Sequence, residues 1–309
     1  MTLTVSVPDA ALLAAIDAAG ALPFDVEVVE WDLSAPPPRP QIDLVVAPYM
    51  GEWLARLPAV AAVRPRLVQG QMLGYDGVAA VLPPGVPYAN ASTVHESSTA
   101  ELAVGLILAS QRGLDDFVRQ AETGQPIARR YPSLADRRVL LLGVGGVGRA
   151  IAARLAPFEV ELTRVGRTGR RDDLGDVHAM SELHRLLPEA EIVILALPLT
   201  SETTGLVDAA FLASLPSDAL LVNVARGAVV DTDALVAAAA AGRLRAALDV
   251  TEPEPLPAGH PLLALPNVIV APHVGGNSTA MAPRMARLVR EQIDRLRAGE
   301  APLCVVIGA

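Results

Sequence analysis

The sequence contains one cysteine, Cys304, and no lysine among its 309 residues. A single thiol excludes an internal disulfide framework and a metal site built from cysteines, so we expect Cys304 to be a small buried hydrophobic residue. All 25 basic residues are arginine. Schiff-base chemistry on a lysine amine is therefore excluded, as is any enzyme that takes its proton from such an amine.

Long apolar runs are also absent. No stretch approaches the roughly 18 to 20 apolar residues needed to cross a bilayer, although the mean hydropathy is +0.38. Residues 2–7 look like a first strand, and no basic region followed by an apolar core precedes them. The net charge of −9 and the pI near 5.1 disfavour nucleic acid and anionic membranes as partners. We therefore expect a cytoplasmic protein that binds neither.

Short apolar strands alternate with helix-patterned stretches, which is typical of α/β folds built from βαβ units. A chain of this length with 51% hydrophobic residues can bury an ample core and suggests about two domains. The early strands are predicted at 2–7, 26–31, 44–47 and 66–70. Helices are predicted at 8–19, at 96–111 and at about 279–298.

A glycine-rich loop joins a predicted strand, 138–142, to a predicted helix, 149–155. The loop consists of Gly143, Val144, Gly145, Gly146, Val147 and Gly148. In a dinucleotide site Gly143 permits the tight turn, Gly145 lets the backbone approach a pyrophosphate, and Gly148 lets the helix pack closely on the strand. The alternative is a purely structural turn, but the strand before the loop and the helix after it favour dinucleotide binding.

The end of the second strand in such a site distinguishes NAD from NADP. An NAD site places Asp or Glu there, about 20 residues after the loop, to bind the ribose 2′-hydroxyl. This position and the residues after it are Gly166, Arg167, Thr168, Gly169, Arg170 and Arg171. Without the acid a 2′-phosphate has room and the arginines can neutralise it, so NADP is favoured, with NAD as the alternative. Asp172 and Asp173 lie close enough to weaken this charge, and a solvated basic turn is the rival interpretation.

Three reactive side chains, Arg226, Glu254 and His273, each stand just past a buried apolar run. Ligands of open parallel sheets bind at the carboxyl ends of the strands. Reduction of a 2-oxo acid needs a cation for the carboxylate and a proton for the developing alkoxide. A guanidinium can hold the carboxylate in a planar fork, and a histidine beside a carboxylate can deliver the proton. Glu252 is a rival partner for His273, and a surface ion pair is the alternative for Arg226.

Five segments of the chain carry motifs in an order typical of one enzyme family. They are 139–148, 197–203, 223–227, 248–255 and 271–273. Together they resemble the D-isomer-specific 2-hydroxyacid dehydrogenase family, although any one of them alone would be a weak signal. The missing lysine excludes the 3-hydroxyacid dehydrogenases and the glutamate or leucine dehydrogenases as close relatives.

The resemblance implies two Rossmann-like α/β domains. A doubly wound dinucleotide-binding domain would span 96–279, and a smaller, discontinuous, flavodoxin-like substrate domain would comprise 1–95 and 280–309. The last strand, 304–307, would rejoin the substrate domain, and a hinged cleft would hold the ligands. The segment 114–134 would reach across a two-fold axis, so the resemblance implies a homodimer.

The resemblance also assigns residues to the site. Leu197 and Pro198 would flank the adenosine, Thr203 would lie near the pyrophosphate, and Ala225 and Asp249 would hold the nicotinamide carboxamide. The cofactor-binding residues expected in all are Gly143, Gly145, Gly146, Val147, Gly148, Gly166, Arg167, Thr168, Arg170, Leu197, Pro198, Thr203, Ala225, Asp249, His273 and Gly275. The catalytic residues expected are Arg226, Glu254 and His273, with Glu254 selected over Glu252 by the family's spacing.

The substrate-binding residues implied are Tyr49, Met50, Gly51, Gly74 and Arg226, and no metal is expected. Because neither substrate loop carries arginine, a phosphorylated substrate is disfavoured. We expect an oxidoreductase that transfers a hydride between NADP(H) and a small 2-oxo or 2-hydroxy acid with D-specificity, such as a glyoxylate or hydroxypyruvate reductase. The alternatives are a dinucleotide-sensing corepressor-like binding protein and a phosphite dehydrogenase-like oxidoreductase.

Overall fold

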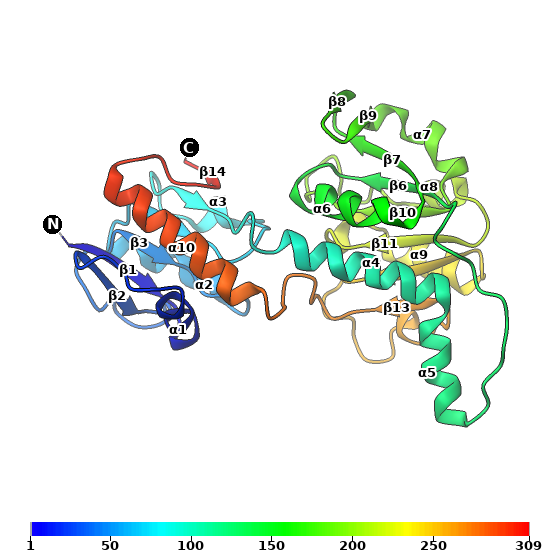
Figure 1. The fold of residues 1–309 in the computed structure, drawn as a ribbon, viewed down its shortest axis with the longest axis horizontal. Helices are drawn as coiled ribbons and strands as arrows, with labels where there is room; N and C mark the ends of the chain where they lie inside the picture. The colour runs from blue at the N-terminus through cyan, green and yellow to red at the C-terminus, as the bar shows by residue number, and fades with distance from the viewer. Residues whose placement is uncertain (1, 309) are drawn as a thin grey trace. The chain divides into compact units, whose positions relative to one another are not determined.

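The computed structural model describes residues 2–308, which form two compact units. Unit 1 comprises residues up to 95 and from 276 onward, and unit 2 comprises residues 96–275. Unit 1 resumes at Gly276, four residues before residue 280, where the second part of the substrate domain was predicted to begin. Each unit has a sheet with helices on both faces (Figure 1), so the predicted α/β class is confirmed. Within residues 2–308, none of the helices combines the length and apolar character needed to span a membrane.

The sheet of unit 1 has six strands, and all neighbours are parallel except the pair formed by the last strand. In spatial order they are β14 (Val305–Ile307), β5 (Tyr88–Ala89), β4 (Leu67–Gln69), β3 (Leu44–Val46), β1 (Leu3–Val7) and β2 (Val26–Glu30). The order of the first five strands along the chain, 2-1-3-4-5, is that of a flavodoxin-like domain. The last strand returns to pair with β5, as predicted for 304–307.

Alternate residues of the strands in unit 1 enter two separate cores. On β3, Leu44 and Val46 face one core while Val45 faces the other, which explains why a parallel strand is apolar throughout. The helices are α1 (Ala10–Ala18), α2 (Trp53–Arg56), α3 (Val78–Val81) and α10 (Met281–Ala298), with a 3₁₀ helix at Leu57–Ala62. Helices α1 and α10 pack together over the first core (Figure 1).

The sheet of unit 2 has eight strands, parallel except for one hairpin at its edge. In spatial order they are β13 (Val268–Val270), β12 (Leu244–Leu248), β11 (Ala219–Asn223), β10 (Ile192–Leu195), β6 (Arg138–Leu142), β7 (Glu161–Gly166), β9 (Gly175–Ala179) and β8 (Arg170–Asp172). The strand order reverses at β6, because β7 lies on one side of it and β10 on the other. This is the doubly wound order that binds dinucleotides at the reversal point.

Helices cover both faces of the second sheet. They are α4 (Glu96–Arg112), α5 (Leu114–Thr123), α6 (Gly146–Leu155), α7 (Leu183–Leu186), α8 (Ala209–Ser214) and α9 (Thr232–Ala240), with short 3₁₀ turns at Ala156–Phe158, Met180–Glu182, Leu187–Glu189, Gly227–Val229 and Pro261–Leu263. Helices α4 and α6 pack side by side on one face, whereas α8 and α9 cover the other (Figure 1). The carboxyl ends of the parallel strands therefore form one edge, where the chain turns into helices and loops.

Candidate active site

The glycine-rich loop leaves β6 at the reversal point of the sheet. Gly143 has a φ of +110°, and a Cβ on it would lie 2.2 Å from the carbonyl oxygen of Ala196. A Cβ on Gly148 would lie 2.0 Å from the carbonyl oxygen of Gly143. Beside Gly145, in contrast, no atom of residues 2–308 beyond its chain neighbours lies within 4 Å of such a Cβ. The loop is thus closed where helix meets strand and open at the N-terminus of α6, where N–H groups can bind a phosphate.

Gly166 ends β7 without a carboxylate. A Cβ there would lie 3.2 Å from Nη1 of Arg170, so the Arg170 guanidinium lies beside this strand end. The same guanidinium donates a long hydrogen bond, 3.4 Å, to the carbonyl oxygen of Thr168. Arg167 is largely exposed, and its Nε lies 3.9 Å from the carboxylate of Glu202. Two guanidinium groups are therefore available at the position where an NAD site places an acid.

Two aspartates of the adjacent hairpin are paired with other arginines. The buried Arg164 of β7 donates hydrogen bonds of 3.0 and 2.7 Å to Asp172, and Arg149 of α6 donates bonds of 2.8 and 2.6 Å to Asp173. The bonds from Arg164, with the amide of Leu174, lower the pKa of Asp172 to about 2. Both aspartates are thus paired with cations other than Arg167 and Arg170.

The loop 197–203 follows β10 and is shaped by one hydroxyl group. Thr203 Oγ1 donates to the carbonyl oxygen of Pro198 at 2.7 Å and accepts from the amide of Thr200 at 2.8 Å. Leu197, at the start of the loop, is buried in the core of unit 2. The Thr203 side chain therefore stabilises the turn within this loop. The loop begins beside β6, the strand that leads into the glycine-rich loop.

His273 and Glu254 meet at the carboxyl edge of the sheet, beyond β13 and β12. Nδ1 of His273 is hydrogen-bonded to Oε1 of Glu254, and about two fifths of each side chain is exposed, 41% and 40%. The other carboxylate oxygen accepts a long bond of 3.4 Å from the amide of Thr251. Glu252, the rival residue, contributes only its carbonyl oxygen, which accepts from the Thr232 hydroxyl. Because Glu254 engages Nδ1, Nε2 is the ring nitrogen that can exchange a proton with a substrate.

The turn that carries His273 is held by the buried Asp249. His273 has a φ of +54°, a left-handed conformation that costs a residue with a side chain roughly 1–2 kcal/mol. The carbonyl oxygen of Asp249 accepts from the His273 amide at 2.9 Å, and its carboxylate accepts from the amides of Val274 and Gly275 at 2.8 and 2.9 Å. A Cβ on Gly275 would lie 2.7 Å from that carboxylate. These bonds stabilise the turn and give the imidazole its direction.

Arg226 stands three residues beyond the end of β11, in a turn that packs on the Glu254 loop. Its Nη1 donates to the carbonyl oxygen of the buried Ala225 at 2.7 Å. A Cβ on Gly227 would lie 1.9 Å from the carbonyl oxygen of Thr251, so only glycine lets the two turns pack this closely. Because β11, β12 and β13 are neighbours, Arg226, Glu254 and His273 all lie at one edge of unit 2.

The remaining candidate residues lie in unit 1, in loops at the carboxyl ends of β3 and β4. After β3, the ring of Tyr49 stacks on His95 with centroids 5.8 Å apart and planes at 13°. Met50 and Gly51 both have positive φ, +63° and +67°, and Met50 is exposed. Gly74 lies in the loop after β4 and is partly exposed. These loops expose the backbone from which the substrate contacts are expected.

Comparison with known proteins identifies the fold's relatives. A family model described as D-isomer specific 2-hydroxyacid dehydrogenase, NAD binding domain, matches residues 104–275. The chain belongs to this family of dehydrogenases. The resemblance seen in the five motifs is thereby confirmed, and the matched domain shows that the chain is an oxidoreductase that binds a nicotinamide dinucleotide.

Individual relatives cover most of the dehydrogenase. The human glyoxylate reductase/hydroxypyruvate reductase is 32% identical to it over 81% of this chain and 82% of the human protein. A D-isomer specific 2-hydroxyacid dehydrogenase from Xanthobacter autotrophicus Py2, solved with NADPH and MES, superposes with a TM-score of 0.81 at 31% identity and covers 99% of this chain and 98% of that chain. An NADPH-dependent glyoxylate/hydroxypyruvate reductase from Sinorhizobium meliloti, solved with NADP and malonate, gives a TM-score of 0.79 at 27% identity over 100% of this chain and 98% of that chain.

Two features of the dehydrogenase were not anticipated from its sequence. Asn223, at the last position of β11, is buried and bonded to both sides of the Arg226 turn; the only signal was a polar residue within an apolar run. His95 is also buried, with Nε2 2.6 Å from the carbonyl oxygen of Gln71 and Nδ1 3.0 Å from that of Gly276. Among residues 2–308 no cluster of three or more His, Cys, Asp or Glu side chains could hold a metal ion.

The Arg164–Asp172 pair predicts a pH-dependent contribution to stability. The pKa of Asp172 is lowered in the folded protein, so the pair stabilises the fold above the unfolded value of about 4, and this contribution is lost as the pH falls toward 2. Asp172→Asn should therefore lower the urea midpoint at pH 7, and the difference from wild type should shrink at pH 3.

The matched control is Asp176→Asn, because the Asp176 carboxylate pairs with the exposed Arg171 and exposed pairs contribute little. Urea titrations followed by circular dichroism measure both variants. An equal deficit of Asp172→Asn at pH 7 and pH 3 would contradict the assignment.

Proposed function

We propose that this dehydrogenase is an NADP-dependent, D-specific reductase of small 2-oxo acids, with glyoxylate or hydroxypyruvate as substrate, and that it works in the cytoplasm. The observation that carries the proposal is the His273–Glu254 hydrogen bond at the sheet edge that also holds Arg226. The names of the human and Sinorhizobium relatives support the substrate class. The single free cysteine agrees with a reducing compartment.

Arg226 is suited to anchor the substrate carboxylate. Its guanidinium can donate two parallel hydrogen bonds to a carboxylate and polarise the adjacent carbonyl group. The contact of Gly227 with Thr251 and the bond to Ala225 fix the turn from which the side chain extends. Anchoring the substrate in one orientation turns a random encounter into a near-attack geometry, which is a large part of the barrier reduction.

His273 is suited to donate the proton to the alkoxide oxygen from Nε2. Glu254 holds Nδ1–H, and its negative charge compensates the positive charge of the imidazolium. In the opposite direction the neutral imidazole would take the proton from the hydroxyl group of a 2-hydroxy acid. When bound, the reduced nicotinamide supplies the hydride. Reduction therefore needs the protonated imidazole, and oxidation needs the neutral one.

The residues around the glycine-rich loop fit a dinucleotide. Gly143 and Gly148 admit no side chain, and the space beside Gly145 is open at the N-terminus of α6, as a pyrophosphate requires. We assign the adenosine to the side of Leu197 and Pro198, with Thr203 shaping the pyrophosphate side of that loop. The other assigned contacts are from Gly146, Val147, Thr168, Ala225, Asp249, His273 and Gly275.

The preference for NADP rests on Gly166 and the arginines beside it. Asp172 and Asp173, which could repel a phosphate, are each paired with an arginine of their own. Arg167 and Arg170 are therefore assigned to the 2′-phosphate. Glu202 lies 3.9 Å from Arg167 in an exposed pair that a phosphate would outcompete.

Unit 1 is assigned to the substrate, through Tyr49, Met50, Gly51 and Gly74. Their loops offer backbone N–H groups and no arginine, which favours a small unphosphorylated acid. The two alternative functions, dinucleotide sensing and phosphite oxidation, would both use the dinucleotide site of unit 2. That site does not distinguish them from the proposed reductase, so the substrate assay must include phosphite.

A homodimer is proposed because the segment after α4 exposes apolar side chains. Of the nine large hydrophobic side chains that are exposed among residues 2–308, four lie between residues 114 and 127: Leu114, Phe117, Val118 and Ile127. Helix α5 extends away from the sheet of unit 2 (Figure 1). A cluster of exposed apolar side chains within one short segment is typical of a protein interface, and the family places its two-fold axis here.

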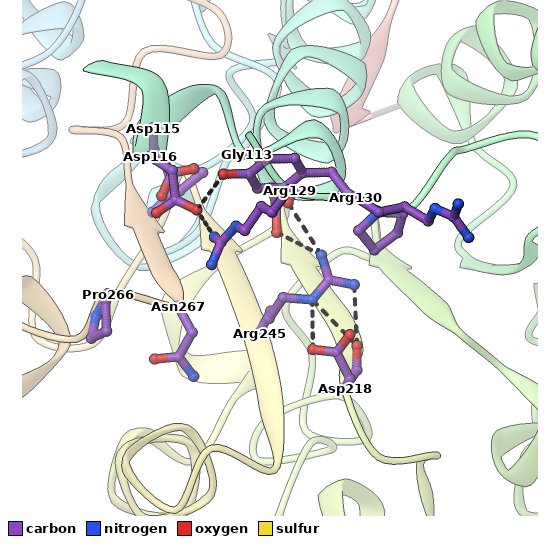
Figure 2. Close-up of a pocket in the computed structure, with 13 residues that line it drawn as sticks. Gly113, Asp115, Asp116, Arg129, Arg130, Asp218, Arg245, Pro266 and Asn267 are labelled. Carbon is purple, nitrogen blue, oxygen red and sulfur yellow. Dashed lines mark hydrogen bonds and ion pairs between the residues drawn. The ribbon is translucent and has the colours of Figure 1, made fainter. Parts of the chain in front are cut away.

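A cavity of about 440 Å³ lies under the same segment and is not the active site. It is lined by residues just before or early in β11, β12 and β13, namely Asp218, Arg245 and Asn267, so it lies at the amino edge of the sheet. Figure 2 shows Arg245 directed at Asp218 and Arg129 directed at Asp116, whereas Arg130 points away from the cluster. The Arg129–Asp116 pair lies within the segment, and the Arg245–Asp218 pair lies at the sheet edge. Arg119 of α5 donates a long hydrogen bond, 3.4 Å, to the carbonyl oxygen of Pro266 at that edge.

The substrate proposal is tested with wild type and His273→Ala. Wild type should reduce glyoxylate or hydroxypyruvate with NADPH to a D-product, and His273→Ala should lower kcat by roughly 10²- to 10⁴-fold because the proton donor is gone. The Kd of NADPH, from fluorescence titration, should change little. The reduction rate of wild type should fall at high pH, whereas the oxidation rate should rise.

Glu202→Gln serves as the matched control for the loss of an ionisable group near the dinucleotide, and it should retain turnover. Oxidation of phosphite without reduction of any 2-oxo acid would instead favour the phosphite dehydrogenase-like alternative. Dinucleotide binding without turnover of either substrate would favour the corepressor-like one.

The cofactor proposal is tested with Arg167→Gln. Wild type should show a higher kcat/KM for NADPH than for NADH, and the variant should lose about 10- to 100-fold with NADPH but little with NADH, because a charged hydrogen bond to the phosphate is removed. Arg171→Gln is the control, since Arg171 is paired with Asp176 in the next strand. Equal kcat/KM values for the two cofactors in wild type would overturn the preference.

The assembly proposal is tested by light scattering at micromolar concentration. Wild type should have twice the chain mass of 32.2 kDa, and Val118→Asp should shift it toward the monomer, because a buried charge without a partner disfavours the interface. Leu263→Asp changes another exposed apolar residue, which lies outside the segment, and this variant should stay dimeric. A wild-type species at the single-chain mass would contradict the proposal.

A further inference from the structure

Asn223 is a buried amide at the carboxyl end of β11, with 1% of its surface exposed. Its Nδ2 donates to the carbonyl oxygen of Arg226 at 2.9 Å, and its Oδ1 accepts from the amide of Ala225 at 3.0 Å. A side chain that bonds the backbone two and three residues ahead defines a local turn. This carboxamide therefore holds the start of the turn by which the chain leaves the strand toward Arg226.

The same residue is linked to the turn of His273 through the backbone. The carbonyl oxygen of Asn223 accepts from the amide of Asp249 at 2.8 Å, and the carbonyl oxygen of Asp249 accepts from the amide of His273 at 2.9 Å. Asn223 and Asp249 are thus buried polar residues whose hydrogen bonds stabilise the turns of Arg226 and His273, respectively. Asp249 holds its turn with a carboxylate, and Asn223 holds its turn with an amide.

We propose that Asn223 is a positioning residue that aims the Arg226 guanidinium at the substrate carboxylate. The inference rests on the proposed function, because it assumes that Arg226 binds that carboxylate. Only an amide satisfies both ends of this turn: it accepts from one N–H group and donates to one carbonyl oxygen. An aspartate at this position would keep the hydrogen bond from the Ala225 amide. Its second carboxylate oxygen would face the carbonyl oxygen of Arg226 and repel it.

The effect of Asn223 should appear in substrate capture. Asn223→Ala and Asn223→Asp should raise KM for glyoxylate by roughly 10- to 100-fold, because a displaced guanidinium loses the paired hydrogen bonds to the carboxylate. The Kd of NADPH should stay close to wild type in Asn223→Asp, which keeps the hydrogen bond from the Ala225 amide. The pH dependence of reduction should stay close to wild type in both variants, since His273 and Glu254 are untouched. A residue with a merely structural role would lower the melting temperature without this selective change in KM.

Asn267→Ala is the matched control. Asn267 lies before β13, at the other edge of the same sheet, and its Nδ2 donates to the carbonyl oxygens of Ala239 and Leu244 at 2.9 and 2.7 Å. Asn267→Ala removes two hydrogen bonds between a side-chain amide and the backbone, as Asn223→Ala does. These two bonds lie at the amino edge of the sheet, at the opposite end of the strands from Arg226. We expect a lower melting temperature for this variant and an unchanged KM.

A double-mutant cycle with Arg226→Ala tests whether Asn223 acts through the guanidinium. In the Arg226→Ala background, Asn223→Ala should cause no further increase in KM, whereas an equal increase in both backgrounds would overturn the proposal. So would an Asn223→Asp enzyme with the KM of wild type. Should Asn223→Ala fold poorly, the Asn223→Asp variant, which keeps one of the two bonds, supplies the comparison.

Calorimetric titration of the NADPH-loaded protein with oxalate separates this inference from the proposed function. Oxalate carries the carboxylate that Arg226 would bind and needs no turnover. If wild type reduces no 2-oxo acid, the proposed function fails, and weaker oxalate binding by Asn223→Asp would still support the positioning role. If wild type is active and the Asn223 variants bind oxalate as wild type does, the positioning role alone is wrong.

Discussion

Parallel pairing of β11, β12 and β13 is the constraint on which the site depends. Asn223 lies opposite Leu248, and Leu248 lies opposite Val270, so three strands end at the same level. These three strands therefore leave the sheet at one edge, and each is followed within six residues by one of the candidate catalytic side chains. Because the strands are buried on both faces, their register cannot slip without moving apolar side chains out of the core.

Buried polar groups at the strand ends convert this register into directed turns. A carboxylate or amide without water must find hydrogen-bond partners, and Asp249 and Asn223 find theirs in the backbone of the turns that follow. The glycines at 227 and 275 then let the turns approach each other and the aspartate. The hydrogen bonds that satisfy these buried polar groups thus also direct Arg226 and His273, so the stability of unit 2 and the geometry of the candidate site depend on the same bonds.

The fold could be predicted largely from apolar periodicity and loop chemistry. Strands at 26–31 and 44–47 and the helix at 96–111 were expected within one residue of β2, β3 and α4, because continuous apolar runs and caps are local signals. The two-residue strand β5 was missed, since its pairing with β14 joins residues far apart in the chain. The hairpin of β8 and β9 was also missed, because charged residues dominate it.

The sequence by itself determined the family and the two-unit α/β fold, and it named the candidate catalytic residues, because all three inferences depend on motifs that are local in the chain. Only the tertiary structure decided the partners of the charged side chains around the glycine-rich loop: it paired Asp172 and Asp173 with arginines from β7 and α6. It also gives the hydrogen bond between His273 and Glu254, the partner that the family's spacing had indicated. Hydrogen bonds of this kind act over about 3 Å, and distance along the chain does not reveal them.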